Sequence, residues 1–121
     1  MKEILTSLLI FTTSFLYSQT RTEKEANVLI NEIHDKLLRR EIGFMAAASE
    51  YSEDEESAKN GGHCEIIKGT HDKKFDKIIF GLDVKQSSRV FKSKEGYNII
   101  VLLEKTKTKA KIMRILIKYK H

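Results

Sequence analysis

The chain has 121 residues, of which 40% are hydrophobic and 32% charged, and its net charge at pH 7 is +5. This length fits a single domain, since domains usually hold about 100–200 residues. The composition excludes a collagen, a low-complexity disordered chain and a disulfide-rich miniprotein. The single cysteine, Cys64, excludes an internal disulfide and a zinc site built from several cysteines. The positive charge permits an anionic partner but does not by itself indicate one.

Residues 1–18 have the pattern of a secretory signal peptide. An uncharged run rich in Leu, Ile and Phe, Ile4–Tyr17, ends at the small residue Ser18, and cleavage there would expose Gln19. The alternative is a retained membrane anchor, but the run of about 14 residues is shorter than the roughly 20 that a spanning helix needs. We therefore expect an exported protein, periplasmic or secreted, with no integral membrane span after cleavage and with one domain over 19–121.

Two helices are predicted at the start of this domain. Thr22 and Glu25 have the spacing of a capping box. Apolar residues at helical spacing follow, namely Ala26, Leu29, Ile30, Ile33 and Leu37. Together they predict a helix over 23–39. Gly43 then interrupts the pattern, and Phe44–Tyr51 predicts a second, Ala-rich helix.

The rest of the chain mixes short strands with one short helix. Residues 52–60 predict an acidic loop with one short helical turn, which ends at Gly61-Gly62. Apolar and β-branched runs between turn residues predict four strands and a helix. The strands are expected at 63–67, 84–91, 97–103 and 112–119, and the helix at 72–80. Helices followed by strands indicate an α+β domain with an antiparallel sheet.

Several of these segments, in this order, resemble the parvulin-type peptidyl-prolyl isomerases. They are FMAAASEYSED (44–54), SAKNGG (57–62), FDKIIF (75–80), VKQSSRVF (84–91) and GYNII (96–100). The resemblance covers about residues 26–104. It implies a parvulin/FKBP-like antiparallel sheet of about four strands with flanking helices.

The first strand of that family has no counterpart ahead of the first helix, because only residues 19–21 separate the expected cleavage site from the capping box. Residues 111–121 resemble it instead. Two explanations stay open, namely truncation inside a second domain and circular permutation. In either case we expect the segment 112–119 to fill the first-strand slot, since an empty slot would leave backbone groups unpaired within the sheet.

The family's reaction is rotation about an Xaa–Pro amide, whose barrier of about 18–20 kcal/mol is set by resonance. No bond is made, so an apolar pocket and a few polar groups that favour the twisted amide are sufficient. The resemblance therefore implies an enzyme without a cofactor that acts on unfolded or partly folded polypeptides containing Xaa–Pro bonds. It implies no metal in this reaction. The oligomeric state stays open.

The resemblance also indicates site residues. Asp54 matches a position beside the substrate carbonyl, where a carboxylate disfavours the negative oxygen of the planar amide. Phe75, His71 and Phe80 are the implied substrate-binding residues, with Phe75 at the floor of the proline pocket. From the residues alone, Phe75 could equally be a core aromatic, and Asp54 could belong to a solvated acidic loop.

Two family histidines that face each other beneath the site are replaced by Asn98 and Arg114, which we take as catalytic candidates with Asp54. Arg114 cannot accept a hydrogen bond, and its burial would be costly unless Asp54 or another carboxylate pairs with it. Glu95 also replaces an aromatic residue before Gly96. These departures predict a weak isomerase, and the alternatives are a non-catalytic, chaperone-like peptide-binding module or a truncated remnant.

Other constellations carry less. His63, Cys64 and His71 lie close in sequence but lack a standard metal-ligand spacing. Cys64 reads better as a buried thiol than as a nucleophile, because its neighbour His63 would point to the opposite face of a strand. The basic segment 105–120 lacks the aromatic residues and motifs of a nucleic-acid site, so we expect no nucleic acid as partner.

Overall fold

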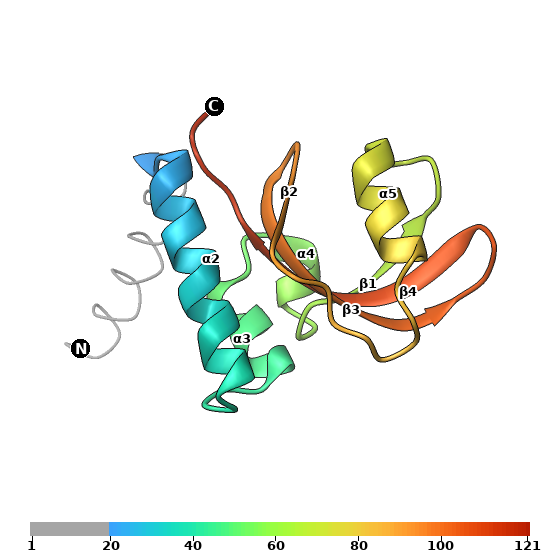
Figure 1. Cartoon of the computed structure of the whole chain (residues 1–121), viewed down its shortest axis with the longest axis horizontal. Coiled ribbons are helices and arrows are strands. Elements are labelled where there is room, and N and C mark those ends of the chain that lie inside the picture. The colour runs from blue at the N-terminus through green and yellow to red at the C-terminus, as the bar shows by residue number, and fades with distance from the viewer. Residues whose placement is uncertain (1–19) are drawn as a thin grey trace.

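The computed structural model describes residues 20–121, and the expected signal peptide lies almost wholly outside them. Three helices come first in this part of the chain, and a single sheet with one further helix follows (Figure 1). The helices are α2 (Glu23–Leu38), α3 (Phe44–Tyr51), α4 (Glu55–Ala58) and α5 (Lys73–Phe80), and the strands are β1 (His63–Ile67), β2 (Phe91–Ser93), β3 (Gly96–Lys105) and β4 (Lys109–Ile117). The predicted α+β class is confirmed, as is the helical turn at α4.

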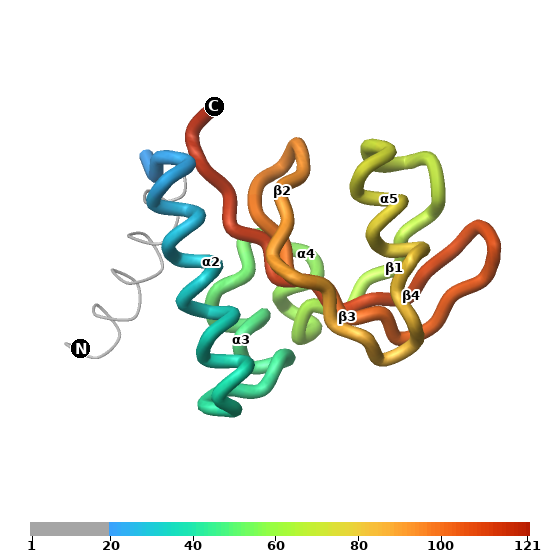
Figure 2. The backbone as a smooth tube through the Cα atoms, in the orientation of Figure 1, coloured from blue at the N-terminus to red at the C-terminus, as the bar shows by residue number. Residues whose placement is uncertain are grey.

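The sheet has four strands in the order β1-β4-β3-β2, and every neighbouring pair is antiparallel. The C-terminal strand β4 therefore lies in the interior of the sheet, as expected, with Ile115 opposite Ile99 on β3 and Ile112 opposite Cys64 on β1. It begins at Lys109, earlier than predicted. Beyond it, the chain passes beside the start of α2, where the Lys120 amide donates to the Arg21 carbonyl over 2.8 Å (Figure 2).

The two faces of the sheet bury separate apolar clusters. Helices α2 and α3 cover one face, where Ile30 and Ile33 pack with Ile99 and Ile115. Helix α5 covers part of the other face, and its residues pack with side chains of β3 and β4 that include Ile100, Leu102 and Ile112. Alternation along each strand sends successive side chains to opposite faces, so one strand serves both clusters.

Local capping explains where α2 and α5 begin. The Thr22 hydroxyl accepts from the Glu25 amide while the Glu25 carboxylate accepts from the Thr22 amide, which is the capping box that the sequence predicted. Asp72 caps α5 by accepting from the Phe75 amide over 2.9 Å. Both caps satisfy backbone donors that a helix start leaves unpaired.

The predicted strand over 84–91 is wrong. Residues 84–90 form a turn and an irregular segment with one isolated bridge, Ser87 to Val101, and only Phe91–Ser93 pairs as a strand. Lys85 has a φ of 71°, which breaks the pleat. Val84 is 54% exposed, so its apolar side chain does not mark a buried position. The irregular segment is still attached to β3, because the Ser88 amide donates to the Ile100 carbonyl.

Within residues 20–121, no helix is both long enough and apolar enough to cross a bilayer.

Candidate active site

Asn98 on β3 and Arg114 on β4 lie on the face of the sheet that α5 covers. Asn98 is opposite Leu116 and Ile100 is opposite Arg114, so the alternation of side chains makes Asn98 and Arg114 diagonal neighbours. The Nε of Arg114 donates to Oδ1 of Asn98 over 2.9 Å. Sequence positions that the family resemblance relates to two facing histidines are thus in direct contact in this chain.

The Arg114 guanidinium is buried, at 3% exposure, and two carboxylates and an aromatic ring surround it. Its Nη2 donates to Oε1 of Glu95 over 3.0 Å, and its Nη1 lies 3.6 Å from Oδ2 of Asp54. Its Cζ lies 5.1 Å from the centroid of the Phe75 ring, within the range of a cation–π contact. A buried cation is costly unless it is paired, and the two carboxylates supply that pairing.

Asn98 has no exposed surface, and both ends of its amide are occupied. Besides accepting from Arg114, it donates through Nδ2 to Oγ of Ser93 over 3.0 Å and to the Gly96 carbonyl over 3.2 Å. An amide held this way cannot turn toward a substrate without losing buried hydrogen bonds. Asn98 is therefore a positioning residue that orients Arg114.

The loop before α4 places Asp54 at the edge of the cluster. The Glu53 amide donates to the Leu116 carbonyl over 2.7 Å, and the Leu116 amide donates to Oγ of Ser52 over 3.1 Å, so the loop is anchored to β4. Oδ2 of Asp54 accepts from Oγ of Ser57 over 2.8 Å. The Asp54 side chain is 27% exposed, so it faces both Arg114 and solvent.

Gly62 brings the end of the α4 loop against β4. Its φ is +90°, and its carbonyl accepts from the Arg114 amide over 2.9 Å. A Cβ at this position would lie 2.8 Å from the Arg114 carbonyl oxygen and 2.9 Å from Cβ of Ala48. Only glycine fits this close approach, which holds Arg114 and the Asp54 loop together.

An aromatic stack forms the opposite wall of the cluster. The His71 ring stacks on Phe75 with centroids 4.5 Å apart and an interplanar angle of 19°, and Phe91 lies 6.0 Å from Phe75. Phe75 has no exposed surface, because His71 covers it on one side and Arg114 contacts it on another. A proline ring would reach Phe75 only after His71 moves, so His71 is the ring that an incoming substrate meets first.

Phe80 is not brought to this cluster. It ends α5, where Nζ of Lys68 lies 5.4 Å from its ring centroid and its carbonyl accepts from Lys105. Phe80 is five positions beyond Phe75 on the same helix, so the two side chains leave the helix in different directions.

Glu95 is the residue of the cluster that the sequence analysis did not assign to the site. It lies in the turn between β2 and β3, and its Oε1 contacts Arg114 and lies 3.9 Å from Nε2 of His71. Gly96 sets the turn, because a Cβ there would lie 2.3 Å from the Ile117 carbonyl oxygen. The available signal was the need of a buried Arg114 for a second carboxylate.

Cys64 lies on the same face of the sheet as a thiol. Burial is the main cause that raises its pKa, to about 11, and the Asp54 carboxylate raises it further. The thiolate is the nucleophilic form, so Cys64 is poorly suited to nucleophilic chemistry at neutral pH. Across residues 20–121, no three His, Cys, Asp or Glu side chains are grouped so that they could hold a metal ion.

A comparison with protein families gives a match over residues 8–104 to the rotamase family described as the PPIC-type PPIase domain. The chain belongs to the PPIC-type rotamase family. The matched PPIC-type region includes Asp54, Phe75, Glu95 and Asn98, and it ends before β4, which supplies Arg114.

Curated relatives of this PPIC-type chain carry names of the same kind. It is 35% identical over 83 residues to a putative peptidyl-prolyl cis-trans isomerase, dodo, of Drosophila melanogaster, which covers 68% of this chain and 49% of that protein. It is 40% identical over 95 residues to foldase protein PrsA 4 of Bacillus cereus, or 78% of this chain and 31% of the relative. Against foldase protein PrsA of Staphylococcus aureus the identity is 37% over 79 residues, 64% of this chain and 25% of the relative. The chain thus spans half or less of the length of these relatives.

Proposed function

We propose that this chain is a peptidyl-prolyl cis-trans isomerase of low activity that acts on unfolded or partly folded polypeptides containing Xaa–Pro bonds. The observation that carries the proposal is the cluster of Asp54, Glu95 and Arg114 beside the His71–Phe75 stack, in a chain of the PPIC-type family. It combines an apolar wall with charged groups at one edge, which is what amide rotation requires.

The roles follow from the charges. Asp54 is partly exposed, and its carboxylate disfavours the negative carbonyl oxygen of a planar amide beside it, which makes the twisted form relatively easier to reach. Of the Arg114 nitrogens, Nε donates to Asn98 and Nη2 to Glu95, whereas Nη1 only faces Asp54 at 3.6 Å. Nη1 is therefore the donor suited to the nitrogen lone pair that develops as the amide twists.

Two features support low activity. The Arg114 cation partly neutralises the Asp54 carboxylate and so weakens its effect on the amide. The cover of His71 over Phe75 must also be displaced before a proline ring enters. The same closed aromatic wall favours the second candidate function, a module that holds extended Pro-containing segments without accelerating their isomerisation.

Exchange NMR on a labelled Xaa–Pro peptide separates these functions. We expect cis–trans exchange that is measurably faster with the protein than without it, and slower again with Phe75→Leu, which keeps an apolar side chain of similar size. Line broadening or shift changes without faster exchange would replace the isomerase with the binding module.

We further propose that residues 1–18 are a cleaved signal peptide and that the mature domain, 19–121, works outside the cytoplasm. The uncharged run Ile4–Tyr17 supports this proposal. Mass spectrometry of the protein recovered from an exporting bacterial host should give a chain that begins at Gln19. Recovery of the uncleaved chain from the membrane fraction would favour the retained anchor.

A further inference from the structure

A groove of about 470 Å³ lies outside the cluster around Arg114, between α2, α5 and the segment that leads into β2. Asn27 and Asn31 of α2 form one side, and Lys74 and Ile78 of α5 form the other. Four consecutive residues, 89–92, line it as well, so the groove follows the backbone of this segment. Strand β2 pairs only with β3, so its outer edge has no neighbouring strand.

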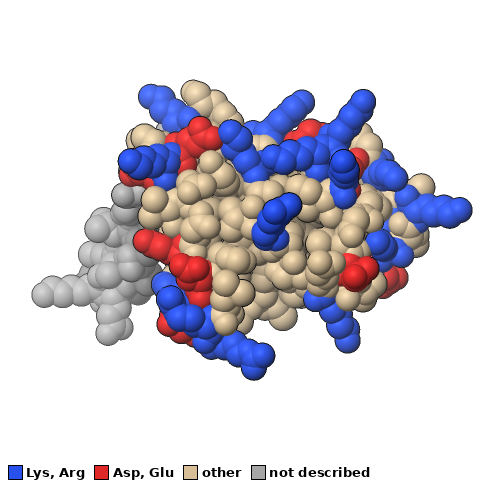
Figure 3. All heavy atoms as spheres, viewed as in Figure 1, with Lys and Arg blue, Asp and Glu red and all other residues tan. Residues whose placement is uncertain are grey.

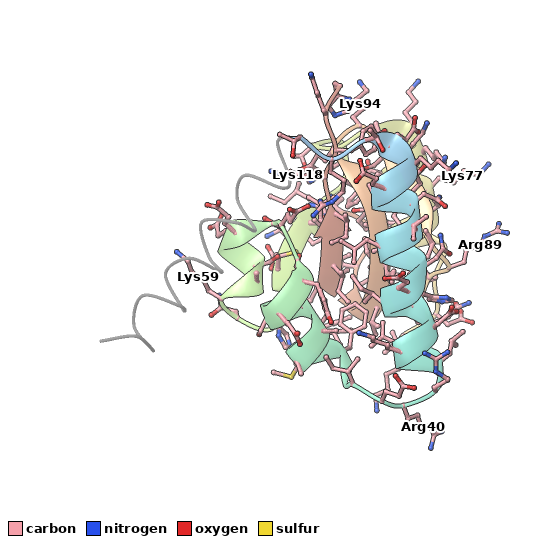
Figure 4. All side chains as sticks on the ribbon, turned by 90° about the vertical axis from the view of Figure 1, so that its left-hand side faces the viewer. Arg40, Lys59, Lys77, Arg89, Lys94 and Lys118 are labelled. Carbon is pink, nitrogen blue, oxygen red and sulfur yellow. The ribbon has the colours of Figure 1, made fainter. Side chains whose placement is uncertain are left out.

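The charges that line the groove are all positive. Lys74, Arg89 and Lys92 line it, and no lining residue is acidic. Lys92 is paired with Glu23 over 2.8 Å, whereas Lys74 and Arg89 have no carboxylate within ion-pair distance among residues 20–121. Figure 4 shows Arg89 projecting from the side of the molecule opposite Lys59. On that face Lys and Arg gather along the upper rim, over β2 and α5 (Figure 3).

Apolar groups line the groove between these cations. Ile78, Val90, Phe91 and Tyr97 contribute them. Phe91 also packs 6.0 Å from Phe75, so it separates the groove from the candidate active site. An extended chain that alternates apolar and acidic side chains would match both kinds of surface, since its successive side chains point to opposite sides.

We propose that this groove is a second binding site, which takes an extended acidic segment of a polypeptide along the outer edge of β2. Its backbone adds beside β2 as an extra strand, and its carboxylates pair with Lys74 and Arg89. The site does not depend on proline or on the isomerase function. It gives the protein an affinity for acidic client segments that is independent of Asp54 and Arg114.

The test uses a fluorescein-labelled, Pro-free peptide of alternating Glu and Val, with fluorescence anisotropy in low salt. We expect the double variant Lys74→Gln/Arg89→Gln to raise the Kd at least fivefold. The control Lys59→Gln/Lys107→Gln changes the net charge equally at exposed positions elsewhere and should alter the Kd less than twofold. A peptide with Lys in place of Glu should not bind. Equal losses in both double variants would mean diffuse attraction and overturn the site, as would no binding by the parent protein.

Amide shifts in NMR then locate the peptide. We expect them at Asn27, Asn31 and Phe91 and not at Asp54 or Glu95; the reverse pattern would place the peptide in the candidate active site and overturn the proposal. Phosphatidylglycerol vesicles that bind through Arg89 while the peptide does not would replace the polypeptide with a membrane. Isomerisation of an uncharged Xaa–Pro peptide should be the same in parent and groove variant, so loss of the isomerase function and loss of this site are separately visible.

Discussion

Arg114 and Asn98 are joined by a hydrogen bond of 2.9 Å from Nε to Oδ1, across the pair of strands β3 and β4. The family resemblance relates these positions to two histidines, which can each donate and accept. Here the direction of the bond is fixed, because arginine only donates. The permanent cation that results is held beneath the site by Asp54 and Glu95, so the charge of the candidate active site rests on this one pair.

Glu95→Gln tests whether the carboxylate compensates the buried guanidinium. Glu95 accepts a hydrogen bond from Arg114 but is 44% exposed, and Asp54 remains as a second carboxylate. We expect the free energy of unfolding to fall by about 1–2 kcal/mol in urea titrations, in the range of a hydrogen bond to a charged group. Glu55→Gln, at an exposed position of α4, is the matched control and should change stability by less than about 0.5 kcal/mol. Equal stabilities for the two variants would contradict the pairing.

The double variant Asn98→His/Arg114→His tests the proposed cause of low activity. It removes the permanent cation beside Asp54 and restores two groups that can share a hydrogen bond. We expect kcat/KM for an Xaa–Pro peptide to rise about tenfold, which corresponds to a barrier lower by about 1.4 kcal/mol. A folded double variant with the activity of the parent would show that the cation does not limit catalysis.

Much of the fold could be predicted because the decisive patterns are local or periodic. The capping box at Thr22 and Glu25 set the start of α2, and the apolar run in 112–119 predicted a strand that β4 confirms as interior to the sheet. The strand over 84–91 failed because its sequence reads as extended while Lys85 takes a positive φ and only three residues pair. Such a local departure depends on tertiary hydrogen bonds to β3.

The cluster was predictable only in part. Asp54, Asn98 and Arg114 came from the resemblance, and their proximity is a property of the strand register. Glu95 was missed because its contact with Arg114 spans 19 positions and no short motif reports it. The cover of His71 over Phe75 and the position of Phe80 away from the cluster depend on how α5 is rotated against the sheet.

Removal of Ile112–His121 tests the role of the C-terminal strand. Because β4 pairs with both β1 and β3, its loss would leave two strands without a partner in the middle of the sheet. We expect no cooperative thermal transition from the shortened chain. A chain that lacks only residues 119–121, beyond the end of β4, should still melt cooperatively. Cooperative melting of the longer deletion would mean that β4 is dispensable.

Cys64 predicts a change of stability with pH. Burial raises the pKa of its thiol to about 11 from a model value of 9.0, so the folded state favours the protonated form. Its contribution is complete below pH 9 and falls as the pH rises toward 11, by about 1–2 kcal/mol after allowance for partial exposure. The stability difference between the parent and Cys64→Ala, measured in urea at pH 8 and pH 10.5, should shrink at the higher pH. A difference that stays constant would contradict the raised pKa.

The most direct test of the proposed function is the cis–trans exchange rate of an uncharged Xaa–Pro peptide, measured by NMR with the parent protein, Asp54→Asn and the control Glu55→Gln. We predict faster exchange with the parent and with Glu55→Gln, and at least a fivefold smaller acceleration with Asp54→Asn, because the neutral amide no longer opposes the planar carbonyl. Exchange at the uncatalysed rate with folded parent protein would contradict the isomerase function. Equal acceleration by all three proteins would remove Asp54 from the site.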